Sequence, residues 1–448
     1  MKPLILLLFG FTAFTTASAQ QPAAAPVIDH ADNAWMLISS ALVLMMTGPG
    51  LALFYGGLVR TKNVLSTMMQ SMFLMSLMSI LWFVFGYSLA FGDGNAVFGS
   101  FTQHLFLRGV GAAPNPDYAA TVPAQTFMIF QMMFAVITPA LITGAFAERI
   151  KFSAFLLLVL GWLPLVYCPL THMMWGKGGY FNWALGGHLP VLDFAGGTVV
   201  HISSGVSALV CAIVLGKRRG FPHEPMLPHN VVLSLIGTGL LWIGWFGFNA
   251  GSALNSGCLA SSTFAATHFA GAAGGLSWAF FEWAVKGKPS VLGAASGMVA
   301  GLATITPASG FVTVAGAVCI GLAAGVVCYL SVTKLKARFG YDDSLDVFGV
   351  HCMGSIVGML MVGFLASAEV NPAIGSTFQI DGHVVSLAGG FPQFFRQLEG
   401  VLFTAVLAGS VTYLLLKLIE ATIGIRVESE DEHAGLDIST HGESAYNH

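Results

Sequence analysis

Two stretches of the sequence each place a carboxylate and an imidazole eight residues apart inside a mostly apolar segment. The first is DFAGGTVVH, with Asp193 and His201, and the second is DSLDVFGVH, with Asp343 and His351. Ionisable groups at membrane depth usually face a cavity or one another. Eight residues of helix rise about 12 Å, so neither aspartate can touch the histidine of its own stretch. The spacing therefore indicates separate roles for the two residue types.

Asp193 stands at the start of its apolar segment, where a helix leaves backbone N–H groups without partners. A carboxylate there can cap the helix by accepting hydrogen bonds from its first turn, and we prefer this structural role to direct contact with a substrate. Even as a cap, the carboxylate of Asp193 would add negative potential near the outer mouth of a pore.

The two histidines can each be read as core imidazoles satisfied by their neighbours. Their paired positions favour a pore instead, in which His201 and His351 share a hydrogen bond and provide uncharged polar groups in a narrow apolar lumen. Neither a metal site nor a cofactor is predicted, because a set of three or four ligands at suitable spacing is missing. A membrane enzyme is disfavoured as well, since no nucleophile accompanies the imidazoles.

Aromatic side chains recur at helical spacing in three further stretches, which are FMIFQMMF, THMMWGKGG and WIGWFGFNAGS. Aromatic residues of a membrane helix ordinarily lie in the core or face lipid. Gathered at one outer mouth, they could instead bind a cation through their ring faces, with a hydroxyl as acceptor. The residues concerned are Phe130, Phe134, Trp175, Trp245, Phe248 and Ser252.

The composition defines the elements that must position these residues. The chain has 448 residues, of which 55% are hydrophobic and 9% are charged, against roughly 25% charged in soluble domains. It is therefore predicted to be a multi-pass membrane protein in a lipid bilayer. Its net charge of −3 does not favour a nucleic-acid partner, and its six scattered cysteines are expected to be buried apolar fillers.

Hydropathy divides the chain into eleven apolar segments long enough to span a bilayer. Basic residues cluster in alternate short loops, which places those loops in the cytoplasm, the mature N-terminus outside and the C-terminal tail inside. The expected spans are 34–58, 65–90, 124–147, 152–171, 193–216, 229–250, 261–285, 290–306, 313–333, 345–367 and 398–423.

The domain organisation follows from these spans. Residues 1–19 are predicted to be a cleavable signal peptide, with an uncleaved anchor as the alternative. Residues 20–33 form a short external segment, 34–423 the membrane domain, and 424–448 a polar, acidic cytoplasmic tail.

The two carboxylate and imidazole stretches also predict the topology. The first lies in the fifth span and the second in the tenth, and an odd number of spans per half makes the halves run in opposite directions. The predicted fold is all-α, with inverted five-helix repeats followed by a C-terminal helix. Such a fold would bring His201 and His351 together from opposite sides.

Several blocks of this sequence resemble those of the ammonium transporter (Amt, Mep and Rh) family, and bacterial Amt proteins in particular. They include LFYGGLVRTKN, GAFAERIKF, LDFAGGTVVHISSG, FGVHCMGSIVG and the tail block GLDISTHGESAY. The resemblance runs from about Ala34 onward. It implies a homotrimer of eleven-helix subunits in the bacterial inner membrane, each with its own pore, and docking of a cytoplasmic PII signal protein.

The resemblance also implies residue roles. Phe130, Phe134, Trp175 and Ser252 resemble the outer site that recruits ammonium, and Phe134 with Phe248 resembles the aromatic gate beneath it. His201 and His351 resemble the twin lumen histidines, and Asp193 resembles a buried structural carboxylate. The family usually has Gly where this chain has Cys352, whose side chain we expect to point toward a neighbouring helix rather than into the pore.

The expected activity is uptake of ammonium and ammonia. Ammonium would shed its proton at the mouth, cross the lumen as ammonia and regain a proton inside, a route closed to potassium because an intact cation is costly to desolvate. Net transfer of the proton or charge would accompany it. The alternative from another class is an ammonium sensor that signals through the cytoplasmic tail and PII proteins.

Overall fold

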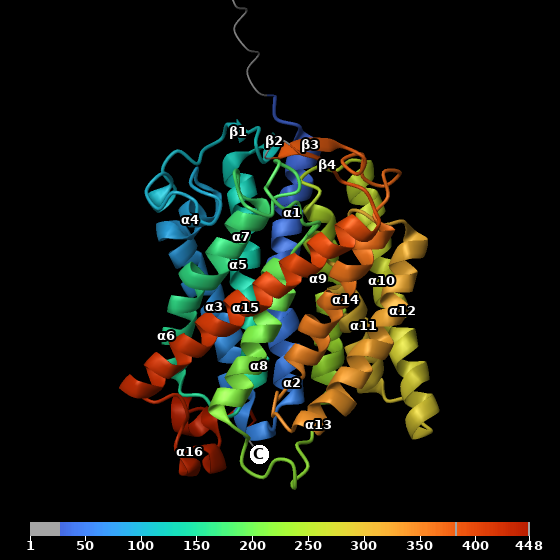
Figure 1. The fold of residues 1–448 in the computed structure, drawn as a ribbon. Helices are drawn as coiled ribbons and strands as arrows, with labels where there is room; N and C mark the ends of the chain where they lie inside the picture. The colour runs from blue at the N-terminus through green and yellow to red at the C-terminus, as the bar shows by residue number, and fades with distance from the viewer. Residues whose placement is uncertain (1–26, 381–382, 447–448) are drawn as a thin grey trace, which may run out of the picture.

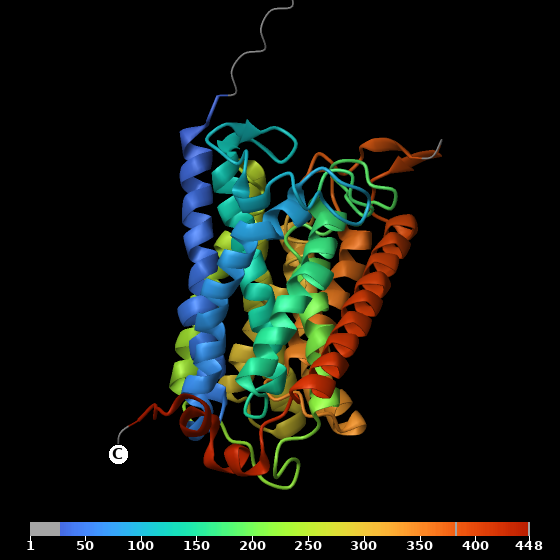
Figure 2. The same cartoon turned by 90° about the vertical axis from the view of Figure 1, so that its left-hand side faces the viewer.

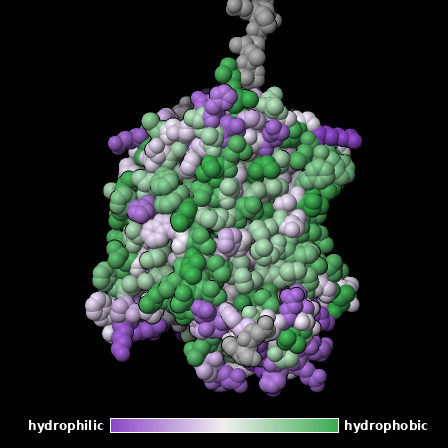
Figure 3. Space-filling view, turned by 180° about the vertical axis from the view of Figure 1, so that it is seen from behind, coloured by the Kyte–Doolittle hydropathy of each residue, from purple (hydrophilic) through white to green (hydrophobic). Residues whose placement is uncertain are grey.

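The computed structural model describes residues 27–380 and 383–446, so the predicted signal peptide 1–19 lies outside the described residues. These residues form a bundle of long helices with two small hairpins at one end and the tail at the other (Figures 1 and 2). We call these the hairpin end and the tail end. Figure 3 shows a broad apolar surface between two more polar ends, as a bilayer requires.

The helices of the described chain follow the predicted spans closely. Within the described residues, nine helical segments are long and apolar enough to cross a membrane. Several are interrupted by π-helical turns, labelled η. The bounds are α1 His30–Met45, η1 Met46–Leu51, α2 Ala52–Leu58, η2 Thr61–Asn63, α3 Val64–Leu81, η3 Trp82–Gly86, α4 Tyr87–Phe91, η4 Leu105–Leu107, α5 Ala124–Phe146, α6 Phe152–Trp162, η5 Leu163–Tyr167 and α7 Cys168–Trp175, where η2 and η4 are 3-10 helices.

The remaining elements complete the bundle and the tail. They are η6 Gly197–Ile202, α8 Ser203–Leu215, α9 Val231–Gly251, α10 Cys258–Lys286, α11 Val291–Ile305, α12 Val314–Leu330, η7 Ser331–Leu335, α13 Lys336–Phe339, η8 Phe348–Cys352, α14 Met353–Leu365, α15 Phe391–Thr422, α16 Ser429–Ala434 and η9 Asp437–His441. The antiparallel hairpins pair β1 Pro114–Asn115 with β2 Ala119–Pro123, and β3 Thr377–Ile380 with β4 His383–Ser386.

Side-chain caps fix where several helices begin. Asp29 accepts hydrogen bonds from two N–H groups of the first turn of α1, and Asn230 accepts one from Leu233 N at 3.1 Å in α9. Ser290 and Thr313 cap α11 and α12 in the same way. Because such caps satisfy otherwise unpaired backbone donors, these polar residues mark helix starts in the sequence.

Glycines allow the helices to pack closely. A Cβ added to Gly274 of α10 would lie 2.5 Å from Gly297 O of α11, and one added to Gly325 of α12 would lie 2.6 Å from Gly274 O. Neither space can hold a methyl group, so α10 contacts both α11 and α12 through its backbone. Small residues serve this purpose in membranes, where apolar burial alone does not drive helices together.

The tail packs against the loops at the tail end. Asp437 accepts hydrogen bonds from Leu65 N at 3.0 Å and Ser66 N at 2.8 Å, so the tail caps the first turn of α3. Lys62 Nζ donates to the carbonyl of His433 at 2.5 Å. The tail therefore forms part of the folded structure, although it is too short to build a core of its own.

Candidate functional site

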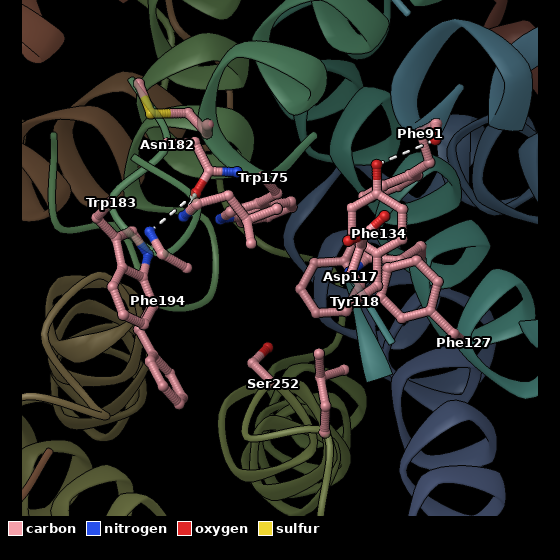
Figure 4. Close-up of a pocket in the computed structure, with 15 residues that line it drawn as sticks. Phe91, Asp117, Tyr118, Phe127, Phe134, Trp175, Asn182, Trp183, Phe194 and Ser252 are labelled. Atoms are coloured by element: carbon pink, nitrogen blue, oxygen red, sulfur yellow. Dashed lines mark hydrogen bonds between the residues drawn. The ribbon is translucent and has the colours of Figure 1, made fainter. Parts of the chain in front are cut away.

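An outer cavity opens toward the hairpin end of the bundle. Its volume is about 110 Å³, and Phe134, Trp175 and Ser252 line it from α5, α7 and the end of α9 (Figure 4). Trp175 Nε1 donates to the carbonyl of Asp193 at 2.9 Å, which fixes the indole. Ser252 Oγ donates to Phe248 O at 2.8 Å, so its lone pairs remain available to accept a hydrogen bond.

Two phenyl rings close the floor of this cavity. The ring centroids of Phe134 and Phe248 are 4.3 Å apart, with an angle of 37° between the planes. Phe134 lines the outer cavity, whereas Phe248 lines a second, deeper cavity. The ring pair therefore separates the two spaces.

The deeper cavity, which we call the lumen, has a volume of about 10 Å³ and is apolar apart from His201 and His351. A buried water needs roughly 10–15 Å³ of such space. The lumen thus has space for about one molecule the size of water.

The two imidazoles lie together in the lumen. Their ring centroids are 5.3 Å apart and the planes differ by 15°. The expected hydrogen bond between them is absent, because the rings lie nearly parallel, and within the described residues both nitrogens of His201 lack a partner. His201 also stacks on Trp245 at 5.6 Å.

Both histidines belong to π-helical turns, His201 to η6 and His351 to η8. Wide turns of this kind are uncommon and often occur at functional sites. The chain reaches η6 through Gly196, whose φ of 118° is a conformation that suits glycine. Local backbone geometry therefore aims each imidazole at the other.

Asp193 caps the turn that carries His201. Its carboxylate accepts hydrogen bonds from Gly196 N at 2.8 Å, Gly197 N at 2.6 Å and Thr198 N at 2.8 Å, and also from the Thr198 hydroxyl. The side chain is completely buried and lines neither cavity. Its contacts are those of a helix cap.

Two further candidates, Phe130 and Trp245, lie in positions that sequence spacing alone does not predict, whereas Cys352 points toward a neighbouring helix as expected. Phe130 is buried behind Phe134, at a centroid distance of 5.0 Å, and does not line the outer cavity. Trp245 lies in the lumen rather than at the outer mouth. Cys352 packs against Gly205 and points toward α8, away from the lumen.

The cysteines differ in burial. All six are free thiols, and Cys258 and Cys319 are exposed instead of being buried fillers. Both exposed cysteines lie on helices α10 and α12, where one helix face points away from the bundle.

A third cavity, of about 290 Å³, continues from the lumen toward the tail end. His351 lines both spaces, so the lumen and this inner cavity adjoin. Arg218, Lys336 and Asp346 line the inner cavity, and its wall is much more polar than that of the lumen. Outer cavity, ring pair, lumen and inner cavity thus form one path through the bundle.

The inner loops carry a buried charge network that the sequence did not reveal. Arg218 Nη2 lies 2.9 Å from Asp342 Oδ1, and Glu148 lies 2.6 Å from Arg60. Burial raises the pKa of Asp343 to about 6, with a further rise from Asp346. Asp343 thus titrates near neutral pH although its neighbour Asp342 is held ionised.

The fold is that of a multi-pass membrane protein, with three adjoining cavities inside its helix bundle. The Ammonium Transporter Family model matches residues 34–446. A putative ammonium transporter of Methanothermobacter thermautotrophicus is 47% identical over 421 residues, covering 94% of this chain and 99% of that protein. An ammonium transporter of Bacillus subtilis is 46% identical, covering 93% and 98%.

Solved structures agree with this assignment. Saccharomyces cerevisiae Mep2 has a TM-score of 0.81 and 34% identity, covering 90% of this chain and 88% of that one. A structure titled Sensor Amt Protein has a TM-score of 0.81 and 25% identity, covering 92% and 98%. The chain belongs to the ammonium transporter family, and it is a membrane transport protein rather than an enzyme.

Proposed function

We propose that this protein takes up ammonium by recruiting it in the outer cavity, deprotonating it and conducting ammonia through the lumen. The single observation that carries the proposal is the ring pair of Phe134 and Phe248, which stands between a polar-edged outer cavity and a lumen of about 10 Å³. Recruitment uses the rings of Phe134 and Trp175 and the free lone pairs of Ser252.

The lumen favours ammonia over a cation. Its wall offers only the imidazoles of His201 and His351 as polar groups, too few to replace the hydration shell of an ammonium or potassium ion. Ammonium can leave its proton behind and potassium cannot. Ammonium and potassium are similar in size, so a rigid filter separates them poorly. Loss of the proton from ammonium therefore provides the discrimination between them.

We propose in addition that the proton crosses as well, so that transport carries net charge. Both nitrogens of His201 lack partners within the described residues, so the neutral imidazole can accept a hydrogen bond from a passing molecule at one nitrogen and donate one at the other. The stacked partner His351 then reaches the polar inner cavity, where ammonia regains a proton.

The test is ammonium-evoked current in proteoliposomes that contain the parent, His201→Ala or His351→Ala. The parent should pass current with ammonium and none with an equal concentration of potassium. Each variant should lose the current or begin to pass potassium. Equal ammonium and potassium currents through the parent would refute the proposal.

We propose that the protein has eleven transmembrane helices in inverted repeats, with its N-terminus outside and its tail in the cytoplasm of a bacterium. Helices α10 and α11 complete the nine longer spans, because both pack against α12 within the bundle. The basic residues Arg60, Arg149 and Arg218 lie at the tail end, which agrees with a cytoplasmic position. Reporter fusions to the tail should be active only as cytoplasmic reporters.

A homotrimer is supported by an unusual outer surface on α10. His268 is exposed there, ten residues into the helix, and its ring lies 5.5 Å from that of Trp242, whose Nε1 lacks a partner in the described part of the chain. An imidazole facing hydrocarbon is costly, so a second copy is expected to cover it. Native mass spectrometry should show trimers, and His268→Ala should weaken them more than Cys319→Ala.

Regulation by a cytoplasmic PII protein is proposed from the docked tail. The contacts of Asp437 with α3 and of Lys62 with His433 join the tail to the inner loops, so a protein bound there could reach the inner cavity. Pull-down with PII proteins while nucleotide effectors are varied tests this, and absence of binding under every condition would contradict it.

The likeness to a structure titled Sensor Amt Protein keeps ammonium sensing as a second candidate function. Ammonium binding without any current would favour the sensor.

A further inference from the structure

One wall of the outer cavity carries polar groups that the recruitment scheme does not use. Asp117, Tyr118 and Gln131 line the same cavity as Phe134 and Ser252, and Figure 4 shows Asp117 and Tyr118 on the side where Phe134 and Phe127 lie. Asp117 and Tyr118 come from the turn between β1 and β2, and Gln131 comes from α5.

The hairpin turn holds the backbone of Asp117 in place. Asp117 N donates to Asn115 Oδ1 at 3.0 Å. The ring of the next residue, Tyr118, stacks on Phe127 at 5.1 Å with an angle of 5°, and its hydroxyl donates to Phe91 O at 3.0 Å. A carboxylate on so well-anchored a turn loses little freedom when it binds a ligand.

Gln131 supplies a second, independent sign of a ligand. Its side chain is only 8% exposed, and within residues 27–380 and 383–446 its Oε1 has no hydrogen-bond partner. Buried amide oxygens are normally satisfied, because leaving one unpaired is costly. An acceptor that lines a cavity and lacks a protein donor is suited to receive a hydrogen bond from a bound molecule.

Lys177 forms an ion pair with the Asp117 carboxylate. Its Nζ lies 2.8 Å from Asp117 Oδ2, while its backbone N–H donates to the Tyr118 hydroxyl at 3.0 Å. The Lys177 side chain is 52% exposed, so the ion pair can open into solvent. The Nζ group is itself a primary ammonium, chemically close to the molecules that the outer cavity is proposed to recruit.

We propose that Asp117 and Gln131 form an outer subsite for small protonated amines, and that Lys177 competes with the incoming amine for the Asp117 carboxylate. This inference rests on the proposed transport function and adds a step before the aromatic site. An amine that displaces Lys177 donates to the carboxylate and to Gln131 Oε1, and then moves inward to Phe134 and Ser252.

The test is the ammonium concentration that gives half-maximal current in proteoliposomes. Lys177→Met should lower it by about two- to fivefold, because an exposed ion pair that competes for the site is lost. Asp117→Asn and Gln131→Leu should each raise it by a similar factor. In the Asp117→Asn background, Lys177→Met should have no further effect, because nothing remains to compete for.

Arg108→Met is the matched control, since Arg108 is an exposed external cation that does not line the cavity. It should leave the half-maximal concentration unchanged. Equal shifts from Lys177→Met and Arg108→Met, or an undiminished Lys177→Met effect in the Asp117→Asn background, would overturn the subsite while transport stands. A parent without ammonium current would refute the transport proposal itself, and the subsite with it.

Discussion

Replacing Asp193 by asparagine tests whether the buried carboxylate holds the turn that carries His201. Oδ1 accepts from Gly196 N and Gly197 N, and Oδ2 accepts from the backbone and the hydroxyl of Thr198. The asparagine oxygen can replace Oδ1, but the NH₂ group then faces two donors. The Thr198 backbone N–H loses its acceptor, at about 1–3 kcal/mol, whereas the Thr198 hydroxyl can turn and accept from the NH₂ group. The free energy of unfolding should therefore fall by about 1–3 kcal/mol.

The assay is thermal unfolding of the purified protein in detergent, combined with ammonium current in proteoliposomes. Asp193→Asn should melt well below the parent and carry little current, because η6 no longer aims His201 at the lumen. The matched control is Asp343→Asn. Asp343 occupies the corresponding place in the second stretch, but its Oδ1 has no partner within the described residues, and asparagine can keep the hydrogen bond that Oδ2 accepts from Phe348 N at 2.8 Å. The reasoning is refuted if Asp193→Asn melts like the parent, or if both asparagine variants lose stability equally.

Three further predictions concern the rest of the bundle. Burial raises the pKa of Asp343 from 3.8 to about 6, so its contribution to stability is present below about pH 4 and is lost as pH rises through 6. Between pH 4 and 7, Asp343→Asn should therefore gain about 3 kcal/mol of stability over the parent. A constant difference in melting temperature across that range would contradict this. Gly205→Ala should destabilise by about 1–3 kcal/mol, since the new Cβ would lie 2.5 Å from Cys352 Cβ, and adding Cys352→Gly should restore part of the loss in a thermal melt. Asp437→Ala should speed hydrogen exchange in α16 and the first turn of α3, at a cost of about 0.5–2 kcal/mol, whereas Glu430→Ala should not.

Much of the architecture could be predicted because its signals are local. Long apolar segments give the positions of helices, and the observed bounds, such as Ala124–Phe146 against the expected 124–147, differ by a few residues. The cap at Asp193 is readable for the same reason, since a carboxylate at the start of an apolar segment has few other ways to be satisfied. The meeting of His201 and His351 could be predicted because DFAGGTVVH and DSLDVFGVH share the same spacing of carboxylate and imidazole.

Helix rotation could not be predicted in the same way. Lipid, core and lumen are all apolar, so hydropathy does not tell which face of α9 carries Trp245 into the lumen or which face of α5 hides Phe130 behind Phe134. The polar wall of the outer cavity could not be predicted from the sequence either. Asp117 and Lys177 are 60 residues apart and meet only because the β1–β2 hairpin folds over the end of α7. Nothing local in either segment indicates that contact.

The two carboxylate and imidazole stretches share a spacing but differ in chemistry. Asp193 and Asp343 each precede a π-helical turn that carries a lumen histidine, yet Asp193 accepts four hydrogen bonds while Asp343 accepts one and lies near Asp346. The two π-helical turns fix the backbone geometry that brings the imidazoles together. Neighbours from other elements then decide whether each carboxylate is a fixed charge or a titrating group. A shared spacing therefore predicts where the histidines meet, but the ionisation of each carboxylate follows from surroundings that the two stretches do not share.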